Sequence, residues 1–150
     1  MKTFGDFVFE SAPAADSVRT VAKDGAVEYR DKVGFLNRLD GPAYEKNGYR
    51  EWRIHGKLSR RDGPAIEGPN GLKEWWLDDK RHRPGGDPAV ELPNGTKEWW
   101  VLGVRHRKNG PAVIGPNGRS ETWVNGKRSP WDIVDSTGAV KPGVAQQRGQ

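Results

Sequence analysis

An internal repeat of 22–24 residues constrains this chain more than any other feature of its sequence. One copy starts at Asp62 and carries, in order, Asp-Gly-Pro-Ala, Pro-Asn-Gly, Lys-Glu-Trp-Trp and Arg-His-Arg elements. Two rows of residues mark the period: Pro42, Pro64, Pro88 and Pro111, spaced 22, 24 and 23, and Glu28, Glu51, Glu74, Glu98 and Glu121, spaced 23, 23, 24 and 23. A fixed period of this length predicts a stack of like supersecondary units.

The repeat also predicts how the chain is organised. We predict four full units and one partial unit over residues 24–130. Residues 1–23 are expected to form an N-terminal cap segment, with a strand at residues 4–9 against the first unit. Residues 131–150 are expected to form a C-terminal cap followed by a flexible tail.

Two turn signals divide each unit into short strands. The first is Pro-Asn-Gly, which supplies one residue with φ near −65° and two that tolerate positive φ. The second is Asn125-Gly126, echoed by His55-Gly56 and Leu102-Gly103, and it suits a two-residue hairpin turn. The segments between the turns are rich in Trp, Val and Leu and show no sustained helical period. The predicted fold class is therefore all-β: an elongated single antiparallel sheet of stacked hairpins, growing by about 10 Å per unit.

Composition fits a thin sheet. The 150 residues include 20 Gly and 11 Pro, enough for a turn at every corner, and hydrophobic residues make up only 33%. The absence of cysteine excludes disulfide scaffolds, thiolate zinc sites and cysteine nucleophiles. No apolar run reaches the roughly 18 residues of a membrane span, and an acid at Asp6 argues against a signal peptide. We therefore expect a cytoplasmic protein, in the host cytoplasm if it is viral.

Strand alternation assigns the side chains to two faces. Trp52, Trp75 and Trp99 share one face with Ile54, Leu77 and Val101, and with Thr122 and Val124 in the last copy. The opposite face carries the glutamate row beside Arg53, Trp76, Trp100 and Trp123. This second row of tryptophans is buried only if Phe4, Phe7, Val8 and Phe9 or neighbouring long side chains cover it; otherwise it forms an exposed aromatic stripe that marks an interaction surface.

The glutamates and a row of arginines share the period. Arg38, Arg60, Arg83 and Arg107 are spaced 22, 23 and 24. One interpretation is a ligand-binding charge ladder. The interpretation that we favour is structural, with each glutamate of the ladder Glu28, Glu51, Glu74, Glu98 and Glu121 paired to one of these arginines across neighbouring strands.

No enzyme signature stands out in the sequence. His82 and His106 occupy the same place in two copies, whereas catalysis needs unlike groups converging at one place, and a zinc site needs three or four ligands. They are interpreted as ordinary strand or turn residues, or as hydrogen-bonding rungs of a binding surface. Phosphate-binding loops, nucleophile elbows and His-Glu-x-x-His are absent from the sequence. We predict a non-enzymatic protein with no catalytic residue, no metal and no cofactor.

The Asn-Gly, aromatic and Gly-Lys positions over residues 24–130 resemble those of the MORN repeat (membrane occupation and recognition nexus). This resemblance implies hairpins stacked into an elongated sheet. The Asp-Gly-Pro-Ala and Arg-His-Arg elements depart from the typical repeat. The Asp-Gly-Pro-Ala variant is similar to repeats in uncharacterised proteins of bacteriophages and large DNA viruses. The likeness to these viral repeats implies a phage accessory protein, for example an inhibitor of a host defence or regulatory protein.

Charge points to a macromolecular partner. Residues 41–130 hold 17 basic and 11 acidic residues, so the excess of positive charge lies in the repeats. The favoured function is binding of a protein partner through Trp76, Trp100, Trp123, Arg53, Arg83, Arg107, His82 and His106. The alternative is binding of single-stranded nucleic acid by phosphate contacts and stacking. A membrane-surface role ranks third and an enzyme last, and open sheet edges leave both a monomer and a homodimer open.

Overall fold

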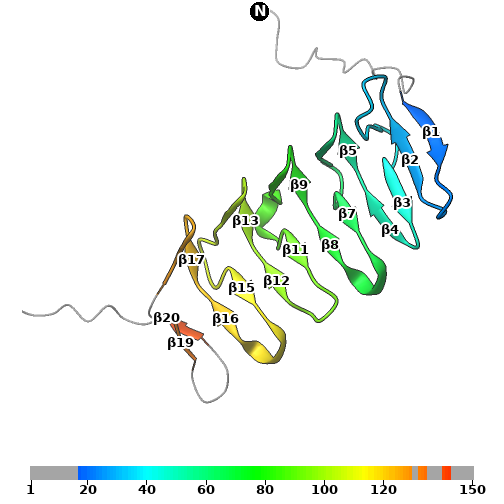
Figure 1. Cartoon of the computed structure of the whole chain (residues 1–150). Helices are drawn as coiled ribbons and strands as arrows, with labels where there is room; N and C mark the ends of the chain where they lie inside the picture. The colour runs from blue at the N-terminus through cyan, green and yellow to red at the C-terminus, as the bar shows by residue number, and fades with distance from the viewer. Residues whose placement is uncertain (1–16, 130–131, 135–139, 143–150) are drawn as a thin grey trace, which may run out of the picture.

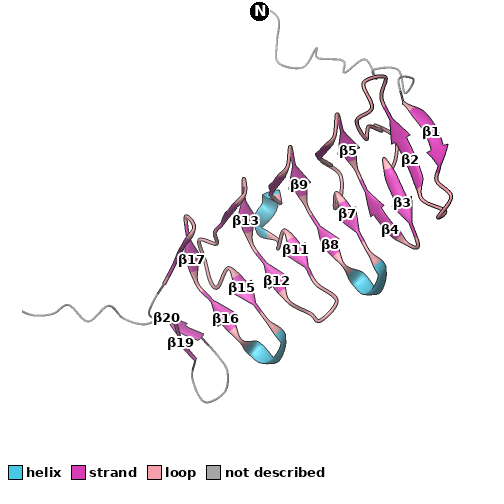
Figure 2. Ribbon diagram, in the orientation of Figure 1, coloured by secondary structure: helices cyan, strands magenta, loops and turns pink. Residues whose placement is uncertain are grey.

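The computed structural model describes residues 17–129, 132–134 and 140–142, and confirms the predicted fold class. Consecutive hairpins lie side by side and form one elongated antiparallel layer (Figure 1). The expected strand at residues 4–9 and the start of the C-terminal cap at Trp131 lie outside the described residues. Only short helical turns interrupt the strands (Figure 2).

The main sheet has ten strands. Its spatial order is β1 (Val18–Val21), β2 (Val27–Arg30), β3 (Tyr44–Lys46), β4 (Tyr49–Glu51), β7 (Ile66–Glu67), β8 (Lys73–Glu74), β11 (Val90–Glu91), β12 (Lys97–Glu98), β15 (Val113–Ile114) and β16 (Ser120–Glu121). Each strand pairs with its neighbours in sequence along this sheet. The main sheet begins with β1, which lies inside the predicted cap segment of residues 1–23.

A second row of short hairpins continues every other strand of the main sheet. These hairpins are β5–β6 (Arg53–Ile54, Lys57–Leu58), β9–β10 (Trp76–Leu77, Lys80–Arg81), β13–β14 (Trp100–Val101, Val104–Arg105) and β17–β18 (Trp123–Val124, Lys127–Arg128). Backbone hydrogen bonds join each one to the next, as from Arg60 N to Trp76 O at 3.1 Å. A last hairpin, β19 (Asp132–Val134) and β20 (Val140–Pro142), follows them.

The two kinds of turn lie at opposite ends of each unit. Two of the three Pro-Asn-Gly turns form the short helices η1 (Pro69–Gly71) and η3 (Pro116–Gly118), with φ of 62° and 64° at their asparagines, whereas the one at residues 93–95 is a non-helical turn. The helix η2 (Pro84–Gly86) lies between units. The short hairpins turn at two residues with positive φ, as predicted for His55-Gly56. In β9–β10 the turn is Asp78-Asp79, with φ of 48° and 61°. The sequence pattern missed this turn because it contains no glycine, but aspartate tolerates the left-handed region.

The buried centre of the sheet is a row of alanines. Ala43, Ala65, Ala89 and Ala112 have no exposed surface. The strand register places each alanine directly between two positions of the aromatic row, so that Ala65 lies between Trp52 and Trp75. Its N–H donates to Glu74 O and its carbonyl accepts from Trp52 N, both at 2.8 Å. Large and small side chains therefore alternate across the sheet, which explains the alanine of Asp-Gly-Pro-Ala.

Enlarging one of these alanines should destabilise the whole array. We expect Ala89→Leu to lower the free energy of unfolding by about 1–3 kcal/mol, because the added methyl groups must enter the space beside Trp75 and Trp99. Urea unfolding followed by tryptophan fluorescence measures the change. The matched control is Ala22→Leu at an exposed turn. Equal effects of the two substitutions would contradict the packing role of the alanine row.

Candidate partner-binding site

The two faces of the sheet differ in chemistry. The face with the glutamate row and Trp76, Trp100 and Trp123 is called here the ladder face. The face with Trp52, Trp75 and Trp99 is called the pocket face. The predicted alternation is seen directly on the ladder face, where the indole of Trp76 donates from Nε1 to Glu74 Oε2 at 2.9 Å, two residues away on the same side.

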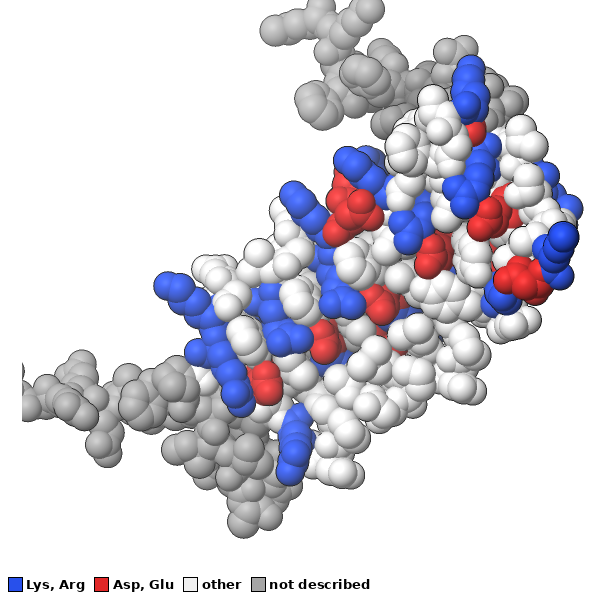
Figure 3. All heavy atoms as spheres, in the orientation of Figure 1, with Lys and Arg blue, Asp and Glu red and all other residues white. Residues whose placement is uncertain are grey.

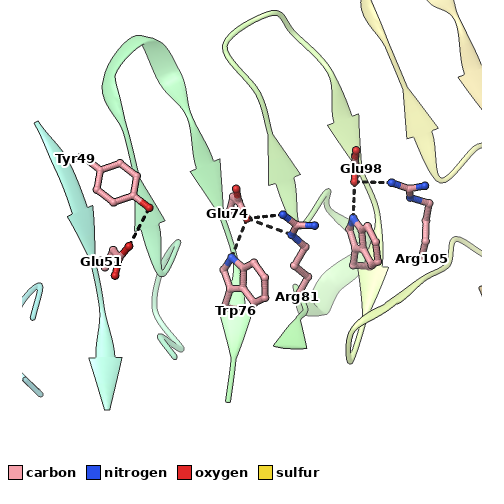
Figure 4. Close-up of polar contacts among 8 residues, drawn as sticks. Tyr49, Glu51, Glu74, Trp76, Arg81, Glu98 and Arg105 are labelled. Carbon is pink, nitrogen blue, oxygen red and sulfur yellow. Dashed lines mark hydrogen bonds and ion pairs between the residues drawn. The ribbon is translucent and has the colours of Figure 1, made fainter. Parts of the chain in front are cut away.

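The ladder face repeats one cluster of three side chains. Glu74 Oε2 accepts from Trp76 Nε1 and from Arg81 Nη2 at 3.1 Å (Figure 4). The next unit repeats the cluster at Glu98, with Trp100 Nε1 at 2.7 Å and Arg105 Nη2 at 3.1 Å. The Glu74 and Glu98 side chains are only 13% and 16% exposed, and both are paired with arginine. The chain itself therefore supplies partners for the buried carboxylates of this face, although Nε of Arg105 is buried without a hydrogen-bond partner among the described residues.

The arginine partners of the ladder differ from those predicted. Its glutamates pair with Arg30, Arg53, Arg81, Arg105 and Arg128, and not with the row that begins at Arg38. The observed partners lie on the same face as the glutamates, either two residues along the strand or on the partner strand of the short hairpin. Where Arg53 takes this role its cross-strand neighbour is Leu58, whereas Trp76 has Arg81 in that place. Whether the arginine stands on the first or the second strand of the short hairpin, each of these two glutamates therefore has one arginine and one large apolar side chain beside it.

The tryptophans of the ladder face are half-buried beside arginines, and Trp100 lies between two of them. The Arg81 and Arg105 Cζ atoms lie 5.3 Å and 4.7 Å from the Trp100 ring centre. Arg81 also lies 4.8 Å from Trp76, and Arg105 lies 5.0 Å from Trp123. Of the two alternatives left open by the sequence, cover by neighbouring long side chains describes these rings better than an open aromatic stripe.

The arginines of the predicted pairing row lie on the pocket face and cover its aromatic rings. Arg38 lies over Tyr29, Arg60 over Trp52, Arg83 over Trp75 and Arg107 over Trp99, with each Cζ 3.8–4.0 Å from the ring centre. At this distance the guanidinium is attracted to the electron-rich ring face. The arginine row is therefore stacked on rings and does not belong to the glutamate ladder.

The loop after each of these arginines fixes the guanidinium in place. Arg60 Nε donates to Asp62 Oδ1 at 3.0 Å, and Nη1 donates to Pro64 O at 3.1 Å. A side chain at Gly63 would meet Arg60 Cζ at 2.8 Å, so glycine leaves room for the guanidinium. The hydrogen bond from Arg60 lowers the pKa of the Asp62 carboxyl. Each residue of Asp-Gly-Pro-Ala therefore has a role. The aspartate pairs with the arginine, the glycine leaves room for the guanidinium, the proline carbonyl accepts a hydrogen bond from it, and the alanine fits between the rings.

Three pockets lie along the pocket face at intervals of one repeat. They have volumes of about 380, 300 and 260 Å³ and are lined by Trp52 with Ile54, by Trp75 with Leu77, and by Trp99 with Val101. Loop side chains form the walls; Arg61 lines the first two, and Lys108 lines the third. A larger hollow of about 790 Å³ lies over the last unit, beside Glu121 and Arg128. That hollow lies at the end of the main sheet and outside the repeated row, so the repeated pockets are the better candidate site.

The structure separates the predicted partner-binding residues into two groups. Arg83, Arg107, His82 and His106 line the third pocket together. Arg53, Trp76 and Trp123 lie on the ladder face, as does Trp100, which also borders this pocket. The sequence did not identify Arg61 and Lys108 as partner-binding residues, although each directly follows an arginine of the stacked row.

The ring of His106 links neighbouring units, whereas Nδ1 of His82 is buried and has no hydrogen-bond partner among the described residues. His106 Nδ1 accepts from the backbone N of Asn125, in the turn of the next short hairpin, at 3.1 Å. Asn37 makes the equivalent contact in the first unit, where its Oδ1 accepts from His55 N at 3.0 Å. The accepting role requires a free lone pair on Nδ1, so His106 carries its ring proton on Nε2 in this arrangement. His82 lines both the second and the third pocket.

The basic side chains gather toward the ends of the short hairpins. Figure 3 shows them as diagonal rows over β5, β9, β13 and β17, with acidic side chains set between them. No family model, curated protein or solved structure matches the chain. The MORN-like character therefore stays a prediction from the repeat sequence. Within the ranges that the structure describes, no helix has the length and apolar character of a membrane span.

The ladder glutamates should matter more than exposed ones. We expect Glu98→Gln to lower the free energy of unfolding by about 1–3 kcal/mol, since Arg105 then keeps no carboxylate partner in a half-buried site. The matched control is Glu45→Gln, whose partner Arg50 lies on the surface and whose loss should cost at most about 1 kcal/mol. Chemical unfolding of both variants measures the difference. Similar costs at the two sites would contradict the ladder's structural role.

Tyr49 should ionise at unusually high pH. Burial and the Glu51 carboxylate, which accepts its hydroxyl hydrogen bond at 3.0 Å, raise the pKa of Tyr49 from 10.0 to about 12. Because the folded-state pKa lies above the unfolded value, neutral Tyr49 stabilises the fold fully below pH 10 and this contribution is lost as pH rises toward 12. Titration of tyrosinate absorbance should show a step near pH 12. Persistence of that step in Tyr49→Phe would contradict the assignment.

Proposed function

We propose that this chain is a non-enzymatic binding protein whose pocket face holds a protein partner. The observation that carries the proposal is the row of three similar pockets at one-repeat intervals. Each pocket combines a tryptophan, an aliphatic side chain and basic loop residues, which are the kinds of groups that dominate protein–protein recognition. The ladder face offers less, because its rings and carboxylates are bonded to each other.

Repetition favours a long ligand over a small one. A small molecule fills one pocket and gains nothing from like pockets one unit away, whereas an extended segment contacts all of them at once. The sheet suits this use because ladders of hydrogen bonds on both sides of each unit fix the distance between pockets. On the resemblance to viral repeats, the partner would be a host defence or regulatory protein.

Binding of single-stranded nucleic acid has less support. Such binding uses open aromatic faces on which bases stack. Here Trp100 lies between two guanidinium groups, and Trp99 is only 7% exposed beneath Arg107. The basic residues alone would bind phosphates, but acidic side chains alternate with them on the face that Figure 3 shows.

Site-directed photo-crosslinking tests the proposal. A photoreactive amino acid placed at Val101, which is 41% exposed on the pocket face, should crosslink to one protein species in a bacterial lysate. The matched control is the same residue at Arg128, an exposed position of a short hairpin on the ladder face. We expect a specific product from Val101 only. Equal yields from both positions, or a nuclease-sensitive product, would contradict partner binding by the pocket face.

A further inference from the structure

The stacked arginines differ in how their charge is balanced. Arg60 pairs with Asp62 at 3.0 Å and with Glu67 at 3.1 Å. Arg83 pairs in the same way with Asp87 and with Glu91, both at 3.2 Å. Two acids therefore neutralise each of these guanidinium groups, which serve the fold and have little charge left for a ligand.

Arg107 lacks both acids. The repeat places Asn109 where the aspartate stands and Ile114 where the glutamate stands in the preceding units. Its guanidinium donates from Nη1 to Pro111 O at 3.0 Å and lies 3.8 Å above the Trp99 ring centre. Over the part of the chain that the structure describes, no carboxylate pairs with it. Arg107 is a fixed, half-buried cation in the wall of the third pocket, and its remaining N–H groups suit a carboxylate.

Two further cations on the pocket face also lack an acidic partner. Arg61 and Lys108 are exposed on the pocket linings, and neither forms an ion pair with any described residue. The linings of the three pockets hold six basic and three acidic side chains, not counting the two histidines. The three acids, Asp40, Asp62 and Asp87, are bonded to stacked arginines. The unpaired charge along the row is therefore entirely positive and calls for an acidic ligand.

The spacing of the pockets selects a backbone conformation. Two antiparallel strands separate neighbouring pockets, a distance of about 9.6 Å. A polyproline II helix brings every third side chain to the same side after about 9.3 Å. An extended strand does so after about 6.6 Å, and an α-helix completes a turn in about 5.4 Å. Only the polyproline II period matches the pocket spacing directly.

We propose that the pocket face binds an acidic, proline-rich segment of the partner in polyproline II conformation. Its side chains at every third position enter successive pockets, and its carboxylates pair with Arg61, Arg107 and Lys108. This inference rests on the proposed function and names the chemistry of the partner.

Synthetic peptides test the inference directly. The probe is a fluorescein-labelled peptide of four Glu-Pro-Pro triplets, and the composition-matched control carries the same residues with the glutamates in one block. Fluorescence anisotropy at low and high salt should show that the triplet peptide binds at least about tenfold more tightly than the block peptide, as expected if even one charge-assisted hydrogen bond is lost. High salt should weaken binding, and a Lys-Pro-Pro peptide should not bind. Equal affinity for triplet and block peptides would overturn the three-residue period.

Variants of this chain locate the contact. The double variant Arg61→Gln and Lys108→Gln removes two exposed cations that hold nothing in the fold, and it should weaken triplet binding at least about tenfold. Arg107→Gln should weaken it as well. The matched control is Arg119→Gln, an exposed residue beyond the Pro-Asn-Gly turn of the last unit, which should leave binding unchanged. An equal effect of Arg119→Gln would mean general charge attraction and would overturn the site.

Competition decides between kinds of ligand. An acidic helical peptide, oligothymidylate or phosphatidylserine vesicles that displace the triplet peptide more strongly than unlabelled triplet peptide would overturn the inference. The proposed function can be judged separately. If the Val101 crosslink to a protein persists undiminished in the Arg61→Gln and Lys108→Gln variant, the pocket face binds a partner by other contacts and only this inference fails.

Discussion

Stacking of arginine on aromatic rings is the interaction on which this structure depends. A single-layer sheet has no second layer to cover its large side chains, and no large side chain here is fully buried among the described residues. Guanidinium groups take that place on both faces, at eight contacts within the described ranges. The planar guanidinium covers a ring while its edges keep hydrogen bonds to carboxylates and carbonyls.

The same interaction ties the last three full units to one another. Arg81 lies between Trp76 and Trp100, which belong to neighbouring units, and Arg105 lies between Trp100 and Trp123. On the pocket face Ala65 and Ala89 each lie between a ring of the preceding unit and a ring of their own unit. A unit taken alone would lose half of these contacts, so stability resides in the interfaces between units. The aromatic row of the pocket face ends at Thr122, where the array has no further full unit to contact.

Local regularity explains what the sequence could predict. The repeat, the hairpins and the assignment of Trp75 and Trp76 to opposite faces follow from a fixed period and strand alternation, and the structure agrees with them. The arginine partners of the glutamates could not be derived in this way, because Arg81 and Arg83 belong to rows with the same period and spacing alone does not reveal which face each one reaches. The arginine that pairs with the glutamate also changes strands between units. It is Arg53, on the first strand of its short hairpin and opposite Leu58, in one unit, and Arg81, on the second strand and opposite Trp76, in the next. This change made the glutamate–arginine pairs harder to recognise in the sequence. The role of Ala65 required the register between three strands, which no single copy of the repeat contains.

Departures from the repeat carry the information about the partner. A contact that recurs in every unit, such as Glu74 with Arg81, is explained by the needs of the fold and says little about a ligand. Asn109 and Ile114 replace the two acids that neutralise Arg60 and Arg83, although Arg107 keeps its ring contact and its carbonyl. The fold in that unit therefore tolerates an uncompensated cation that each earlier full unit avoids. A charge kept in place without a partner inside the chain is best explained by a partner outside it, and its position in a pocket beside Lys108 indicates that the external group is an anion.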